Sequence, residues 1–179
     1  RNQPGRGNGG QVVEGGNKGS LWAAFSPTPT PIGQRLLLAI AAHDGLSVRL
    51  GDVATAFLHA KRDEGEVVYV KPPPQRQKPN VVWRLQKALY GLRRSPQHFN
   101  EFFAGEMKKL GYDRCISDPQ LFYNKKARAL PSAHAADLML AAPSTVINQL
   151  TTAITASMTL QSATLLSAAP RQSYLGKTR

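Results

Sequence analysis

The sequence predicts an α+β domain, in which helices and short strands alternate along one chain. Apolar residues recur every three or four positions at 99–110 and again at 146–158, which is the spacing of one helical face. Short apolar runs at 67–71 and 121–123 have instead the length of strands. With 179 residues, the chain is long enough for one domain with a core, or for a piece of a larger domain.

The composition favours an anionic partner. The net charge is +12 and the pI is about 10.3, which puts nucleic acid first and an anionic membrane surface second. Cys115 is the only cysteine, so an internal disulfide and a cysteine-based zinc site are excluded. The longest uncharged apolar run, at 36–42, is too short to cross a bilayer, and no secretory signal precedes it. We therefore expect an intracellular protein, and the start at Arg1 rather than Met indicates a fragment.

The amino-terminal part has almost no large apolar side chains. Gly, Asn and Gln dominate it, so burial cannot offset its ordering entropy, and we expect a flexible leader over residues 1–24. An extended segment should follow, held by Pro27, Pro29 and Pro31. We then expect a helix that begins just after Gly33 and stops near Gly45, where glycine suits a carboxyl-terminal cap.

A mainly apolar run begins at Ser47, and one carboxylate, that of Asp52, lies at its end. Small residues follow, and Phe57 comes shortly after them. An aspartate in this position can serve as a ligand for a hard cation. Alone, however, an aspartate after a strand is more often a turn former or a helix N-cap.

The best nucleic-acid footprint lies between residues 71 and 100, which include no acid at all. Trp83, Tyr90 and Phe99 are interleaved with the cations, which would allow stacking on bases beside phosphate neutralisation. A solvated basic face with core aromatics is the alternative, and it is the more common situation for Trp83 and Phe99. The seven cations are Lys71, Arg76, Lys78, Arg84, Lys87, Arg93 and Arg94.

The carboxyl-terminal half alternates between helices and strands. Ser95 is expected as the N-cap and Pro96 as the first residue of a helix that ends at Gly111. A short strand is expected at residues 121–123. The stretch 146–158 keeps a helical spacing.

Taken in order, these segments resemble the reverse transcriptase of Ty1/copia-type LTR retrotransposons. The resemblance runs over residues 25–179, and it implies a reverse-transcriptase palm, an antiparallel sheet backed by helices, with partial fingers, truncated before the thumb and ribonuclease H. The matching motifs are Phe25-Ser26-Pro27 with 35–39, 52–59, 67–73, Ala88-Leu89-Tyr90-Gly91-Leu92-Arg93 with Ser95-Pro96, 110–112, 117–122 and Tyr174-Leu175-Gly176.

The resemblance implies nucleotide addition to a DNA primer on an RNA template, with deoxynucleoside triphosphates as substrates and Mg²⁺ (or Mn²⁺) as cofactor. Asp52 and Asp137 match its catalytic, metal-binding carboxylates, and Val53 would add a backbone carbonyl. Two ions in such a site would activate the primer hydroxyl and hold the triphosphate.

The resemblance also assigns the nucleotide site. Arg35 matches a contact to the triphosphate, Phe57 matches a gate against the ribose 2′-hydroxyl, and Tyr90 and Gly91 match the floor under the new base pair. A solvated arginine and a core phenylalanine are the respective alternatives. Thr30 stands where the family commonly has a lysine, so one phosphate contact is expected to be missing. The seven cations would contact template and primer.

The second catalytic motif departs from the family pattern, which is Tyr-x-Asp-Asp. Ala136 stands at the position of the first, metal-binding aspartate, His134 replaces the tyrosine, and Asp137 remains. Imidazole suits zinc or iron better than magnesium, so His134 is a poor substitute. We therefore expect weak or absent metal binding and little or no polymerase activity. The alternatives are a non-catalytic nucleic-acid-binding relic of a decayed element, and a product that does not fold. The resemblance also implies an apolar approach strand that leads into this motif, and a proline inside it disfavours a central strand. Three residues interrupt this strand: Arg128, Pro131 and Ser132.

Overall fold

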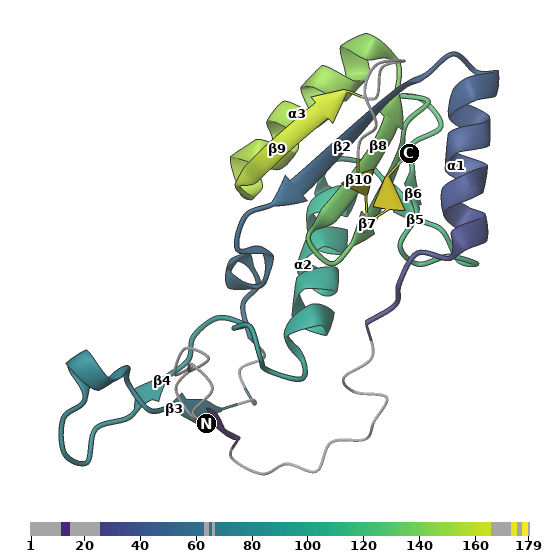
Figure 1. The fold of residues 1–179 in the computed structure, drawn as a ribbon. Helices are drawn as coiled ribbons and strands as arrows, with labels where there is room; N and C mark the ends of the chain where they lie inside the picture. Colours follow the sequence, from purple (N-terminus) through teal and green to yellow (C-terminus); the bar gives the residue numbers. More distant parts are fainter. Residues whose placement is uncertain are drawn as a thin grey trace, which may run out of the picture.

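A computed structural model describes residues 12–14, 26–62, 65, 67–165, 173–174 and 177–178. Its centre is a four-stranded antiparallel sheet in the order β7-β8-β2-β9, with helices on both faces (Figure 1). The mixed α+β class predicted from the sequence is therefore confirmed. The central strands are β2 (Ser47–Val53), β7 (Leu130–His134), β8 (Asp137–Ala142) and β9 (Leu160–Leu165), and the helices are α1 (Pro31–His43), α2 (Ser95–Lys109) and α3 (Ser144–Ser157).

Smaller elements surround this sheet. The short strands are β1 (Val12–Glu14), β3 (Val68–Val70), β4 (Trp83–Arg84), β5 (Asp113–Arg114), β6 (Phe122–Tyr123), β10 (Ser173–Tyr174) and β11 (Lys177–Thr178), and the 3₁₀ turns are η2 (Ala56–His59) and η3 (Pro74–Arg76). Strands β1, β3 and β4 form a second antiparallel sheet, in which β1 comes from the segment expected as a leader. The rest of the leader, and Phe25, Leu175 and Gly176, lie outside the described residues.

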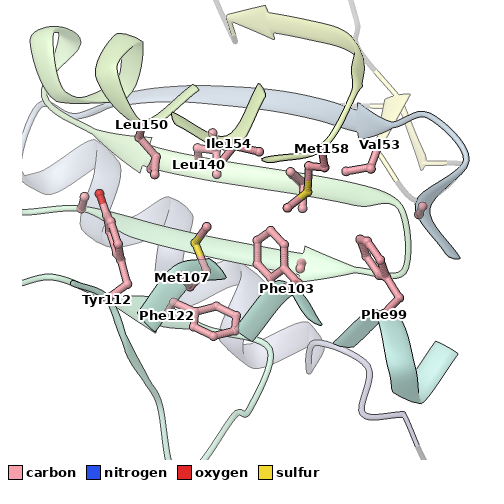
Figure 2. Packing of buried hydrophobic residues seen from close by; sticks show 14 of the residues in the cluster. Val53, Phe99, Phe103, Met107, Tyr112, Phe122, Leu140, Leu150, Ile154 and Met158 are labelled. Carbon is pink, nitrogen blue, oxygen red and sulfur yellow. The ribbon is translucent and has the colours of Figure 1, made fainter. Parts of the chain in front are cut away.

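The core lies on both faces of the central sheet. On one face, Val53, Leu138 and Leu140 pack against apolar side chains of α2 and α3 (Figure 2). On the other face, α1 packs on Leu50 and Met139. Side chains alternate between the two faces of a strand, and β8 is buried on both faces from Leu138 to Ala142 because it lies at the centre.

Helix α1 begins earlier than the sequence predicts. The Oγ1 atom of Thr30 accepts a hydrogen bond from the Gly33 backbone N–H (2.9 Å), which makes Thr30 the N-cap and Pro31 the first helical residue. At the other end, Gly45 has φ +63°, and the Leu46 N–H donates to the carbonyl oxygen of Ala41 (2.8 Å). The predicted glycine-containing end of the helix is thus confirmed.

Helix α2 begins without the predicted serine cap. Ser95 is the first helical residue, and no side chain caps the helix. Its hydroxyl instead donates to the Leu89 carbonyl oxygen (2.6 Å) and accepts from the Leu89 N–H (3.1 Å), which closes the loop before α2. The predicted apolar stripe is present, with Phe99, Phe103 and Met107 buried.

Strand β7 forms despite Pro131. The N–H of Ala133 points away from β8 and donates to the Gln120 carbonyl oxygen (3.1 Å). Backbone groups of residues two apart point to the same side of a strand, so the N–H that Pro131 lacks belongs to this outer edge. Proline is tolerated at such an edge, and the expectation of a broken approach strand is wrong.

Candidate active site and nucleic-acid interface

The two candidate carboxylates lie on adjacent strands. Asp52, near the end of β2, and Asp137, at the start of β8, are directly opposed Cα partners. Opposed residues of an antiparallel pair have Cα atoms about 4.5–5.5 Å apart and point to the same face. His134 of β7 is in turn the partner of Asp137, so the three residues form one row across the sheet. All three side chains are partly buried.

Irregular backbone surrounds this row. The pairing of β2 with β9 shifts by one residue between Asp52 and Val53, so a bulge lies beside the carboxylate pair. Val53 N–H donates to the Ala136 carbonyl oxygen (2.9 Å), which ties β2 to the turn between β7 and β8. In that turn Ala135 has φ +49°, a left-handed conformation that costs an alanine about 1–2 kcal/mol. Bulges and strained turns are common beside functional groups.

An aromatic group follows β2. The ring of Phe57, in η2, lies 4.6 Å from the ring of Tyr90 and 6.3 Å from that of Phe99, centroid to centroid. Tyr90 is 52% exposed, whereas Phe99 is buried and Phe57 packs partly against the core. Gly91 has φ +91°, a conformation that a side chain would strain. Phe57 therefore contributes both to the rim of the core and to an accessible aromatic surface with Tyr90.

Arg35 lies apart from these groups along the chain. It is an exposed residue of α1 and makes no ion pair with another residue that the structure describes. Helix α1 covers the sheet face to which Leu50 and Met139 point. By alternation, this is also the face of Asp52 and Asp137. Arg35 and the carboxylates thus belong to the same side of the molecule.

Six of the seven candidate nucleic-acid contacts are exposed, and Arg94 is half-buried. Residues 67–87, named here the arm, include β3, η3 and β4 and project away from the central sheet (Figure 1). Tyr69 and Arg84 are opposed partners on β3 and β4, and both are exposed. Trp83 is also exposed to 41%, unlike Phe99, for which the core alternative holds. The arm therefore presents cations and aromatic rings together, without an acidic residue among 67–100.

Comparison with known families decides the class of protein. Residues 18–176 match the family model described as "Reverse transcriptase (RNA-dependent DNA polymerase)". The chain belongs to this reverse transcriptase family. The chain is also 35% identical over 98 residues to the transposon Ty5-1 protein of Saccharomyces cerevisiae, a match that covers 52% of this chain and 31% of that protein.

Two plant polyproteins are similar as well. The retrovirus-related Pol polyprotein from transposon TNT 1-94 of Nicotiana tabacum is 35% identical over 104 residues, covering 56% of this chain and 8% of the polyprotein. The Pol polyprotein from transposon RE1 of Arabidopsis thaliana is 29% identical over 109 residues, covering 59% and 7%. The matched regions span less than a third of each of these relatives. The predicted likeness to Ty1/copia-type elements is confirmed.

The residues of this reverse transcriptase chain do not fit a pair of Mg²⁺ ions. Ala136 supplies only a methyl group and a carbonyl oxygen, and that oxygen already accepts from Val53. Within the described part, no three His, Cys, Asp or Glu side chains gather closely enough to hold a metal. Mg²⁺ requires a near-octahedral shell of oxygens. The Nδ1 atom of His134 is buried and has no hydrogen-bond partner among the described residues, so the histidine adds no oxygen and no fixed orientation.

A polar network that the sequence analysis missed anchors α1. Both the backbone N–H (3.0 Å) and the hydroxyl (2.9 Å) of Thr30 donate to Oδ2 of Asp118. The Gln120 amide donates to the Pro27 carbonyl oxygen, and Asn100 of α2 donates to Oε1 of Gln120 (2.6 Å). Thr30, which stands where the resemblance places a lysine in the family, therefore caps and anchors the helix. The Thr-Pro pair was the available sequence signal for the cap.

Arg114 extends this network. Its guanidinium donates to Oδ1 of Asn100 (2.8 Å) and lies over the ring of Phe122, 5.4 Å from the centroid. Burial lowers the pKa of Arg114.

Among the described residues, no helix is long and apolar enough to cross a membrane.

Proposed function

We propose that this chain is the palm with partial fingers of a copia-type reverse transcriptase, and that it binds template and primer but adds nucleotides weakly or not at all. The observation that carries the proposal is the opposed pair of Asp52 and Asp137 beside Ala136. The opposed pair would bring two carboxylates together, whereas Ala136, in the adjacent turn, has no carboxylate to add.

The proposed loss of activity follows from charge. Nucleotidyl transfer in this family implies two divalent cations, which carry four positive charges, and Asp52 and Asp137 together offer two negative ones. Without another carboxylate, the protein supplies too little negative charge and too few oxygen ligands for two Mg²⁺ ions. Each 1.36 kcal/mol lost from stabilisation of the transition state slows the reaction tenfold. We therefore expect a decrease of several powers of ten relative to a chain with an intact motif.

The nucleotide contacts are proposed on the same basis. Arg35 would contact the triphosphate, because a guanidinium forms paired hydrogen bonds with phosphate oxygens. Phe57, backed by the ring of Tyr90, would lie against the sugar, and Tyr90 with Gly91 would support the new base pair. Val53 would contribute its backbone carbonyl beside Asp52.

A non-catalytic role as a nucleic-acid-binding relic is the second candidate. Ala136 favours it, and so do the exposed cations of the arm, because binding to phosphates needs positive charge and not an intact metal site. Under this reading the RNA template and DNA primer remain partners, whereas the deoxynucleoside triphosphates do not.

Primer extension on an RNA template separates these candidates. The unmodified chain, Ala136→Asp and Asp52→Ala would be compared with deoxynucleotides and either Mg²⁺ or Mn²⁺. We expect extension by Ala136→Asp only, and the double variant Ala136→Asp/Asp52→Ala should be inactive again. Extension by the unmodified chain that Asp52→Ala abolishes would contradict the proposed impairment. Inactivity of Ala136→Asp, in a chain that folds and binds RNA, would favour the relic.

A further inference from the structure

A groove lies on the side of the sheet opposite to the carboxylate row. It has a volume of about 220 Å³ and lies between the carboxyl end of α2, the turn at 124–127 and α3. Its size suits a large aliphatic or aromatic side chain from outside. The side chains that line it are mainly apolar: Leu110, Tyr112, Ala127, Val146, Leu150 and Ala153.

Helix α3 beside this groove is unusual for a surface helix. None of its fourteen residues is Asp, Glu, Lys or Arg, although the chain as a whole has 23 cationic residues. Its exposed positions include Gln149 and Thr152, and also Asn148, whose Oδ1 accepts a hydrogen bond from Arg49 of β2 (2.8 Å). A helix that faces water normally carries charges on its outer side, whereas the centres of protein interfaces are depleted in charged residues. The outer face of α3 therefore has the composition of a surface that becomes covered.

Four lysines lie around the groove, at the end of α2 and in the turn at 124–127. Lys108 and Lys109 end α2, next to Leu110, and Lys125 and Lys126 lie in the turn between two groove residues. All four are exposed, and only Lys109 has an ion pair within the described residues, with Glu106 at 2.6 Å. An apolar groove with a cationic rim complements an apolar segment that carries acids.

We propose that this groove binds an amphipathic helix of a protein partner, with apolar side chains in the groove and acidic side chains against Lys108, Lys125 and Lys126. A second copy of this chain is disfavoured, because each copy has a net charge of +12. Nucleic acid is disfavoured because, among the described residues that line the groove, only Tyr112 has an aromatic ring, and at 6% exposure it offers no stacking surface. The carboxylate row lies on the opposite sheet face, so the site is independent of the proposed polymerase function.

The test uses a labelled acidic amphipathic peptide of about 16 residues, with leucines at helical spacing and glutamates elsewhere. A peptide of the same composition in scrambled order, and one with lysine in place of glutamate, serve as probe controls. Fluorescence anisotropy would measure binding to the whole chain and to two pairs of variants. Ala153→Glu adds a charge inside the groove, and Ala156→Glu adds it to an exposed position of α3 outside the groove. Lys125→Gln/Lys126→Gln removes rim charges, and Lys71→Gln/Lys78→Gln removes the same number from the arm.

We expect Ala153→Glu and Lys125→Gln/Lys126→Gln each to weaken binding of the acidic peptide about tenfold or more. The matched controls should stay within about twofold, and unfolding curves would verify that every variant folds. Equal binding of the scrambled peptide, or equal effects of Ala153→Glu and Ala156→Glu, would overturn the proposal. Displacement of the peptide by a short RNA at low salt would also overturn it, because the surface would then be part of a nucleic-acid site.

Discussion

Tyr112 shows how a single buried residue links packing to pH. Its ring lies at the edge of the main core, near Met107 and Phe122 (Figure 2), and burial raises the pKa of its hydroxyl above the usual value of 10.0. A buried phenol resists ionisation because the phenolate loses its hydration. The folded protein therefore binds the Tyr112 proton more tightly than the unfolded chain does.

This difference predicts a loss of stability in alkali. Between the two pKa values the unfolded chain binds fewer protons, so the free energy of unfolding decreases as pH rises from about 10. The contribution is fully present below pH 10 and is lost as pH rises toward the folded-state value. Tyr112→Phe should remove this part of the slope, measured by urea unfolding at a series of pH values from neutral to strongly alkaline. Parallel curves for the two proteins would contradict the prediction.

At the scale of elements, the position of α1 depends on a close approach of the Asp118 side chain to the backbone of the helix at Gly33. A Cβ atom at Gly33 would lie 2.3 Å from Oδ2 of Asp118 and 3.1 Å from Oγ1 of Thr30, the two groups that anchor the helix. Glycine is therefore required for space at this position, although it is a poor residue inside a helix.

Two glycine-to-alanine substitutions should accordingly have opposite effects. Gly33→Ala should lower the free energy of unfolding by about 1–3 kcal/mol, because the methyl group displaces Asp118 or Thr30. Gly105→Ala, in α2, meets no atom within 4 Å and should raise it by about 0.5–1 kcal/mol through helix propensity. Denaturant unfolding at neutral pH measures both. Stabilisation by both substitutions would contradict this prediction, because the side chains of Asp118 and Thr30 would then move aside with little loss of stability.

Local rules predicted the helices and strands more reliably than the contacts between them. The apolar stripe of α2 and the glycine after α1 depend on neighbouring residues, and both were predicted. The role of Thr30 as an anchor depends on Asp118, which is 88 residues away and therefore beyond any local sequence pattern. Pro131 predicts a broken strand only if the strand is central, and the sequence alone does not say which edge of β7 remains outside. The resemblance matched Asp52 and Asp137 to metal-binding carboxylates, but their direct opposition was not predicted, since register between distant strands is a tertiary property.

At the scale of the whole molecule, two surfaces among the described residues carry clustered cations. The arm projects from one end of the structure (Figure 1). It carries exposed cations and rings, whereas the lysines around the groove lie at the carboxyl end of α2 and in the turn at 124–127. Any cation attracts phosphate at long range, so net charge alone does not tell which surface contacts nucleic acid. The salt dependence of binding does identify that surface, because each cation that contacts a phosphate releases counterions and makes binding fall more steeply with salt.

The arm should therefore determine how steeply RNA binding falls with salt. For single strands, the logarithm of the binding constant decreases with the logarithm of the salt concentration by about 0.7 for each neutralised phosphate. The triple variant Lys71→Gln/Lys78→Gln/Arg84→Gln should consequently reduce the slope by about 2. The matched control Lys108→Gln/Lys125→Gln/Lys126→Gln removes the same net charge and should leave the slope nearly unchanged. Titrations of a labelled single-stranded RNA at several salt concentrations measure both slopes. Equal reductions in the two variants would show that the chain binds RNA through its overall charge and not through the arm.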